Sequence, residues 1–255
     1  MKSVVCHGKK YEVEPHKLAL HNKNIAEFSE IEGLNSLTEL QELDLENNKI
    51  RKIEGLEYLS SLQILNLGHN CLNEIANLDE LKQLRELSLA FNQITEIKGL
   101  ENLINLEILD LRSNNINEIK KLSTLKNLRE LYLSFNEITE IKGLEDLQSL
   151  RILDLRTNKF HDIKGLGNLL NLKQIFLGIK GYADSYKLNG KKIETSLVRY
   201  LRRGYRPVVP WGIPSRIRFD FMKLYKFQTQ LKARKVVEFC RHPENYYTEP
   251  HPISR

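Results

Sequence analysis

Apolar residues recur along the middle of the chain with a fixed spacing, and this spacing predicts most of its structure. Two leucines separated by one residue, Leu43 and Leu45 in the first full copy, return every 22 residues. An alternation with period two predicts a short β-strand that points both leucines inward and the residues around them outward. The aliphatic residues that follow are spaced by three, which favours a 3₁₀ or short helical turn over a second strand. The pattern therefore predicts coils made of one strand and one return leg.

An asparagine follows each strand, always three residues after the second leucine. At a turn, an inward asparagine can both donate and accept hydrogen bonds, so it can satisfy backbone groups that the bend leaves unpaired. Each coil can bury its leucines only against neighbouring coils, so the strands should form one parallel sheet. We expect these asparagines to form a structural ladder inside the stacked coils. They are Asn48, Asn70, Asn92, Asn114, Asn136 and Asn158.

The repeated unit, L-x-x-L-x-L-x-x-N-x-[ILF]-x-x-I-x-x-L-x-x-L, resembles that of leucine-rich-repeat proteins of the 22-residue subclass. Its I-x-G-L tail, as in Ile97–Leu100, is similar to that of the leucine-rich-repeat regulatory subunit of protein phosphatase one. The resemblance implies an α/β solenoid with a curved parallel β-sheet on the concave face and 3₁₀ or short helical turns on the convex face. It also implies a phosphatase as one candidate partner. Asn77 and Lys121 replace the glycine of this tail in two units, from which we infer that the position does not demand a positive φ.

Departures from the unit mark the ends of the array. Lys23 stands where the first ladder asparagine would belong, and three extra residues follow before the next I-x-G-L. We therefore assign residues 1–34 to an N-terminal cap, made of a hairpin around His7-Gly8 and a degenerate first repeat, because the end of a solenoid needs a cover. The regular repeats occupy residues 35–178, and residues 179–255 form a separate C-terminal region.

Charge divides the chain at the same boundary. Residues 1–178 carry 22 Lys and Arg against 27 Asp and Glu, whereas residues 179–255 carry 17 against 6, a net charge of +11. Short helical patterns interrupted by prolines predict a basic, mainly helical C-terminal cap and a flexible tail. Three roles are open for this region. It could cover the last coil, bind an anionic ligand such as RNA or an acidic membrane surface, or fold back onto an acidic concave face and block it.

The outward positions of the strands carry the information about a partner, because the repeated positions are used by the core. They combine isoleucine and aromatic residues with acids, which is the usual makeup of a protein interface. The alternatives are a solvated sheet or a surface covered by the chain's own tail. Arg112 and Arg156 should each neutralise a nearby aspartate, and the excess acid predicts a protein partner with a basic surface rather than nucleic acid. The candidate partner-binding residues are Glu42, Asp44, Glu86, Phe91, Ile108, Asp110, Arg112, Glu130, Tyr132, Phe135, Ile152, Asp154, Arg156 and Phe176.

These variable positions repeat with a longer period than the fold requires. Residues 84–100 and 128–144 differ at only three of seventeen positions, and residues 106–122 are echoed by residues 150–166. We interpret the 44-residue spacing as the duplication of a two-coil unit, preserved on the concave face.

Signals for catalysis are missing from the sequence. The chain has no glycine-rich phosphate loop and no paired histidines with metal-ligand spacing, so we expect a non-catalytic scaffold or regulatory subunit without a metal or cofactor. The three cysteines are scattered and predict no disulfide framework. The polar N-terminus does not resemble a secretory signal, and no apolar run approaches the ~20 residues of a membrane span. We therefore expect a cytoplasmic monomer.

Overall fold

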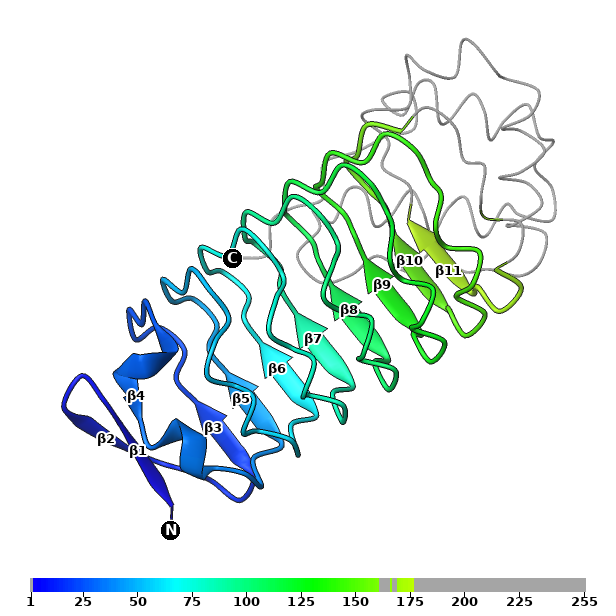
Figure 1. Ribbon diagram of the computed structural model, residues 1–255. Coiled ribbons are helices and arrows are strands. Elements are labelled where there is room, and N and C mark those ends of the chain that lie inside the picture. Colours follow the sequence, from blue (N-terminus) through cyan, green and yellow to red (C-terminus); the bar gives the residue numbers. More distant parts are fainter. Residues whose placement is uncertain (1, 161–165, 167–168, 177–255) are drawn as a thin grey trace, which may run out of the picture.

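The computed structural model describes residues 2–160, 166 and 169–176, and shows an elongated stack of coils. Short strands lie along one side of the stack and the return legs lie along the other (Figure 1). Every neighbouring pair in the main sheet is parallel and consecutive along the chain, which confirms the predicted parallel solenoid. The strands are β3 (Lys17–Ala19), β5 (Glu42–Asp44), β6 (Ile64–Asn66), β7 (Glu86–Ser88), β8 (Ile108–Asp110), β9 (Glu130–Tyr132), β10 (Ile152–Asp154) and β11 (Gln174–Phe176).

The register between strands follows the 22-residue spacing of the sequence. The central leucine of each strand lies opposite the central leucine of the next, from Leu43 to Leu153, and these side chains are almost fully buried. The residues on either side of each central leucine form two rows on the outward side of the sheet. We call these two rows, together with the side chains that follow the strands at Phe91, Arg112, Phe135 and Arg156, the sheet face. The first row is Glu42, Ile64, Glu86, Ile108, Glu130, Ile152 and Gln174, and the second is Asp44, Asn66, Ser88, Asp110, Tyr132, Asp154 and Phe176.

The predicted asparagine ladder joins the coils from inside. The Nδ2 atom of Asn114 donates to the carbonyl oxygens of Leu89 and Leu111, at 2.9 and 3.1 Å. Its Oδ1 atom accepts from the amide nitrogen of Ile94 at 3.0 Å, so one side chain bonds backbone groups of two coils. The same donor and acceptor contacts recur at the other ladder positions, and the prediction is confirmed. These positions are Asn48, Asn70, Asn92, Asn136 and Asn158.

The return legs are chains of single turns. In one of them the amide of Leu103 donates to the carbonyl of Leu100 at 3.0 Å, and the amide of Leu106 donates to the carbonyl of Leu103 at 2.9 Å. These are the i to i+3 bonds expected from the three-residue spacing. Within the described residues, only η1 (Phe28–Glu30) and η2 (Leu34–Ser36) are 3₁₀ helices.

The glycine position of the I-x-G-L tail does demand a positive φ, contrary to the inference from the sequence. Asn77 and Lys121, which replace the glycine, have φ of 58° and 57°, close to the 66° of Gly99. The coil path therefore sets the backbone conformation, and the residue type decides only its energetic cost.

The return side also carries a continuous series of ion pairs between successive coils. Each lysine lies between a glutamate of its own coil and a glutamate of the preceding coil, with N–O distances of 3.0 to 3.6 Å. In order, the side chains are Glu74, Lys98, Glu96, Lys120, Glu118, Lys142 and Glu140.

A small antiparallel sheet lies at the N-terminal end of the stack. It contains β1 (Ser3–Cys6), β2 (Lys9–Glu12) and β4 (Ile31–Glu32), with β1 in the centre. Strands β1 and β2 form a hairpin whose two turn residues, His7 and Gly8, both have positive φ, as a tight hairpin turn requires.

The degenerate first repeat still contributes β3 to the main sheet, although it lacks the ladder asparagine and has three extra residues. Asn48 of the next coil compensates, because its Oδ1 atom accepts from the amides of Lys23 and Ile25.

The predicted helical C-terminal cap at residues 179–255 lies outside the described residues. In the part of the chain that the structure describes, no helix is long and apolar enough to span a membrane.

Candidate functional site

The sheet face presents the outward rows that the sequence predicts, with unequal exposure. In the first row, Glu86 is exposed, whereas Glu130 and the isoleucines Ile108 and Ile152 are half-buried. Neighbouring strands of a sheet lie about 4.8 Å apart, so the two glutamates stand two strands, or roughly 9–10 Å, from one another. The middle of the sheet face, over β7 to β10, therefore alternates acidic and apolar side chains.

Two Asp–Arg pairs lie on the sheet face, as the sequence predicts. In the first pair, the Nε atom of Arg112 donates to both carboxylate oxygens of Asp110 at 2.9 Å, and Nη2 donates to Oδ2 at 2.5 Å. The guanidinium also lies over the ring of Tyr132 on the next strand, with its Cζ atom 5.3 Å from the ring centroid. The hydrogen bond to Asp110 raises the pKa of Arg112. The Arg112 guanidinium therefore stays charged and has its hydrogen-bond partner within the chain.

The second pair repeats this arrangement one two-coil unit later. The Nε atom of Arg156 donates to Asp154 at 2.7 Å, and its Cζ atom lies 5.2 Å from the ring centroid of Phe176. Asp154 and Phe176 are 0% and 1% exposed, and Arg156 is also buried.

The expectation that every predicted residue is accessible on the sheet face is therefore wrong for Asp110, Asp154, Arg156 and Phe176, all of which are buried. The physical reason is that each carboxylate bonds the arginine two residues later, and each guanidinium then lies over the following aromatic ring. These four residues are therefore not part of the accessible surface of the sheet face.

Tyr132 and Glu130 form a further internal contact. The hydroxyl of Tyr132 donates to Oε2 of Glu130 at 2.6 Å. Burial and this hydrogen bond raise the pKa of Tyr132, so its hydroxyl stays protonated. The bond holds the Glu130 carboxylate in a fixed position on the sheet face.

Two phenylalanines are exposed where the strands end. Phe91 and Phe135 are 47% and 54% exposed, and Phe91 stacks on His69 with ring centroids 4.0 Å apart. Every residue at this position has a left-handed backbone, with φ between 52° and 58°. That conformation costs a residue with a Cβ atom roughly 1–2 kcal/mol, and only Gly, Asn and Asp adopt it readily. Phenylalanine there carries this cost and still leaves about half of its surface exposed, which points to a contact outside the chain.

Two acids at the N-terminal end of the sheet face lie next to basic residues of the degenerate first repeat. Lys17 on β3 lies 2.9 Å from Glu42, and His21 lies 3.4 Å from Asp44. The offset between β3 and β5 is 25 residues instead of 22, because the first repeat has three extra residues. The sequence shows this insertion, but the predicted outward rows begin at Glu42 and therefore leave out both basic residues. Along the two strand rows, Glu86 is the first acid that has no Lys, Arg or His partner within the described residues.

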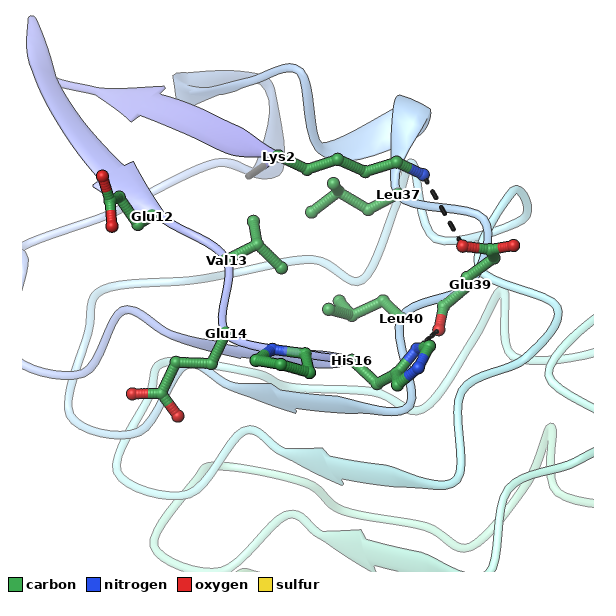
Figure 2. A pocket seen from close by; sticks show the side chains of 9 residues that line it. Lys2, Glu12, Val13, Glu14, His16, Leu37, Glu39 and Leu40 are labelled. Carbon is green, nitrogen blue, oxygen red and sulfur yellow. Dashed lines mark hydrogen bonds and ion pairs between the residues drawn. The ribbon is translucent and has the colours of Figure 1, made fainter.

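A pocket of about 560 Å³ lies between the end of β2 and the first return leg. Its inner side is apolar, with Val13, Leu37 and Leu40 (Figure 2). The side chain of Lys2 reaches along one side of it towards Glu39, with Nζ and Oε2 4.0 Å apart. These contacts join the hairpin to the first coil. The pocket therefore lies at the junction between the cap and the solenoid.

Within residues 2–160, 166 and 169–176, no group of three or more His, Cys, Asp or Glu side chains is placed to hold a metal ion. Cys6 and Cys71 are free thiols.

Family models match the repeated part of the chain. The model described as "Leucine Rich repeats (2 copies)" matches residues 82–127 and 126–168, and the model described as "Leucine rich repeat" matches residues 38–94. A search of curated proteins finds none that matches the chain.

Three solved structures that are similar to this chain come from bacteria. Internalin C2 of Listeria monocytogenes is 28% identical, with 64% of this chain and 80% of that chain covered and a TM-score of 0.52. An internalin F of the same species is 27% identical, with 60% and 51% covered and a TM-score of 0.51. A leucine-rich-repeat protein of Leptospira interrogans is 35% identical, with 56% and 38% covered and a TM-score of 0.54.

The matched models together span residues 38–168, the same part of the chain in which the coils, the leucine core and the asparagine ladder are built. Proteins with this fold generally act as protein-interaction modules without enzymatic activity. This chain belongs to the leucine-rich-repeat proteins.

Proposed function

We propose that the sheet face over β7 to β10 binds a protein partner, and that the chain acts as a scaffold or regulatory subunit. The observation that carries the proposal is the pair of exposed phenylalanines, Phe91 and Phe135, on a left-handed backbone. Aromatic side chains are the usual anchors of protein interfaces, because each can bury a large area at a small cost in side-chain entropy. Their cost to the stability of the free chain is offset only if a partner covers them.

Charge on the same surface favours a partner with basic side chains. Glu86 is exposed and makes no ion pair within the described residues, and Glu130 presents a carboxylate fixed by Tyr132. A lysine or arginine of the partner could pair with either carboxylate, and the faces of the two phenylalanine rings could accept a cation. The residues that we propose as contacts are Glu86, Phe91, Ile108, Glu130, Tyr132, Phe135 and Ile152.

The test replaces both phenylalanines with asparagine in the full chain. Asparagine suits the left-handed backbone, so F91N/F135N should fold at least as stably as the wild type. The matched control is Y58N/I104N, which removes two apolar side chains of the return legs that are 55% and 56% exposed. Affinity capture with quantitative mass spectrometry should identify a protein that is retained by the wild type and the control but lost by F91N/F135N. If F91N/F135N retains the same proteins as the wild type, the sheet face is not the interface.

A purified protein phosphatase catalytic subunit is a defined first partner to measure, because of the similarity of the I-x-G-L tail. Its binding to the wild type and to F91N/F135N can be compared by isothermal titration calorimetry. Removing two aromatic anchors should weaken binding at least tenfold, since each anchor typically contributes more than about 1 kcal/mol.

A further inference from the structure

A row of basic side chains lies next to the sheet face, at the residue that immediately precedes each first-row position. We call it the basic row, and it lies on the coils of β7 to β11. It contains Arg85, Arg129, Arg151 and Lys173, with one acid, Glu107. Its net charge is therefore +3. The equivalent residues of the β5 and β6 coils are uncharged, Gln41 and Gln63.

Backbone hydrogen bonds hold the last three members on consecutive coils. The amide of Arg151 donates to the carbonyl of Arg129 at 2.7 Å, and the amide of Lys173 donates to the carbonyl of Arg151 at 2.8 Å. Neighbouring coils are about 4.8 Å apart, so the three cations stand in direct register. The backbone positions of these three residues are thus fixed by hydrogen bonds between the coils.

The single acid of the row already forms ion pairs with two of its arginines. One carboxylate oxygen of Glu107 lies 2.6 Å from Nη1 of Arg129, and the other lies 3.9 Å from Nη1 of Arg85. Arg151 and Lys173 are exposed and make no ion pair within the part of the chain that the structure describes. Like charges on neighbouring strands destabilise a sheet, and the glutamines at the same position in earlier coils show that the fold does not require them. Two neighbouring cations that have no ion pair in the described part of the chain therefore point to an external anion.

We propose that Arg151 and Lys173 bind a phosphorylated side chain of a protein partner. A phosphorylated serine or threonine carries a charge of about −1.5 to −2 and three acceptor oxygens, so one group can accept hydrogen bonds from both side chains and match their two charges. The fork of an arginine fits a phosphate bidentately, and lysine adds a second, adaptable charge. A carboxylate offers one negative charge and would leave one of the two cations uncompensated. This site lies beside the proposed protein interface and does not depend on it.

The test is a titration of the ¹⁵N-labelled full chain, followed by NMR, with the peptide Gly-Ala-phosphoserine-Ala-Gly. Three versions are compared, carrying phosphoserine, serine or glutamate at the central position. The amide signals of Ile152 and Gln174, the residues that directly follow Arg151 and Lys173, should shift with the phosphorylated peptide and stay unchanged with the serine peptide. Reading individual amides separates this site from general attraction to the basic residues 179–255.

The variant R151Q/K173Q should lower the affinity measured at these two signals at least tenfold. The matched control R51Q/K52Q also removes one arginine and one lysine, at exposed positions that make no ion pair within the described residues, and should bind as the wild type does. The proposal is overturned if only signals of residues 179–255 respond, if the two double variants behave alike, or if the glutamate peptide binds as tightly as the phosphorylated one. F91N/F135N should bind the phosphorylated peptide normally, so failure of the proposed function and failure of this site give different results.

Discussion

Replacing Asn114 with alanine should lower the free energy of unfolding by about 2–5 kcal/mol, because it removes one set of hydrogen bonds from the asparagine ladder. The side chain accepts a hydrogen bond from the buried amide of Ile94 at 3.0 Å and donates to the carbonyls of Leu89 and Leu111. In N114A the two carbonyls keep a donor each. Leu89 still accepts from Asn92 at 3.1 Å, and Leu111 still accepts from Asn136 at 2.9 Å.

The amide of Ile94 is the group that loses its only side-chain acceptor. A buried donor left without a partner costs about 1–3 kcal/mol, and the two lost carbonyl bonds add roughly 0.5–1 kcal/mol each. Asn115, the next residue, supplies a matched control: its side chain is exposed, and its backbone amide still donates to the carbonyl of Ile94. N115A should therefore change stability by less than about 0.5 kcal/mol.

Urea unfolding followed by far-ultraviolet circular dichroism measures both variants. The slopes of unfolding free energy against urea must agree with that of the wild type, because a solenoid can unfold in parts and the comparison assumes one transition. The reasoning is refuted if N114A costs less than about 0.5 kcal/mol, or no more than N115A. Either result would mean that water or a shift of the coil satisfies the amide of Ile94.

Three further predictions concern the core, the backbone and the surface. L111A should lower the free energy of unfolding by about 2–5 kcal/mol in the same urea assay, since Leu111 is fully buried. K121G should raise the melting temperature, because glycine adopts the φ of 57° without the roughly 1 kcal/mol cost that lysine bears. An unchanged or lower melting temperature would show that the backbone of Lys121 is not strained. E96Q should be less stable than the wild type at pH 7, and the difference should disappear at a pH below the lowered pKa of Glu96. Its hydrogen bond from Lys98 lowers the pKa of Glu96 below the usual 4.5, so the stabilisation is present above that pH and is lost as the pH falls through the lowered value. In 1 M salt the difference at pH 7 should shrink, since both groups are exposed.

The fold could be predicted in detail because its determinants repeat. The leucines and the ladder asparagines each recur at the same place in coil after coil, so the register of any pair of strands follows from counting. The rows of the sheet face follow from the same count. Counting in steps of 22 misplaces only β3, because an insertion increases the offset between the paired residues Lys17 and Glu42 to 25.

The backbone at Lys121 could not be deduced from its residue type. A lysine where other units have glycine suggests that the position accepts ordinary φ values, yet the structure holds it at 57°. The hydrogen bonds and packing of neighbouring coils fix the path of the chain, and a single unfavourable residue is tolerated at a cost of roughly 1 kcal/mol. A sequence shows which residue occupies a position, but it does not show the free-energy cost of that residue's backbone conformation.

Burial on the sheet face was also beyond the sequence. The alternation of the strands correctly directs Asp154 and Phe176 outward from the leucine core, but direction does not determine exposure. The Asp154 carboxylate bonds Arg156, whose guanidinium lies over the ring of Phe176, so long side chains cover residues that the backbone points towards solvent. The basic row was missed for a different reason: it lies one residue before the rows that the strand pattern defines.

The two-coil period of the variable positions has a physical basis in these side-chain contacts. An arginine on the sheet face, such as Arg112, requires an aspartate on its own strand and an aromatic ring on the next strand, as Asp110 and Tyr132 provide. If the next coil instead repeated the Asp–Arg pair, like charges would lie directly opposite each other and destabilise the sheet. The arrangement of Asp, Arg and aromatic side chains can therefore repeat only every two coils. Phe91 and Phe135 are separated by the same 44 residues. A partner that recognises this surface should have matching groups at intervals of roughly 9–10 Å, the distance spanned by two coils.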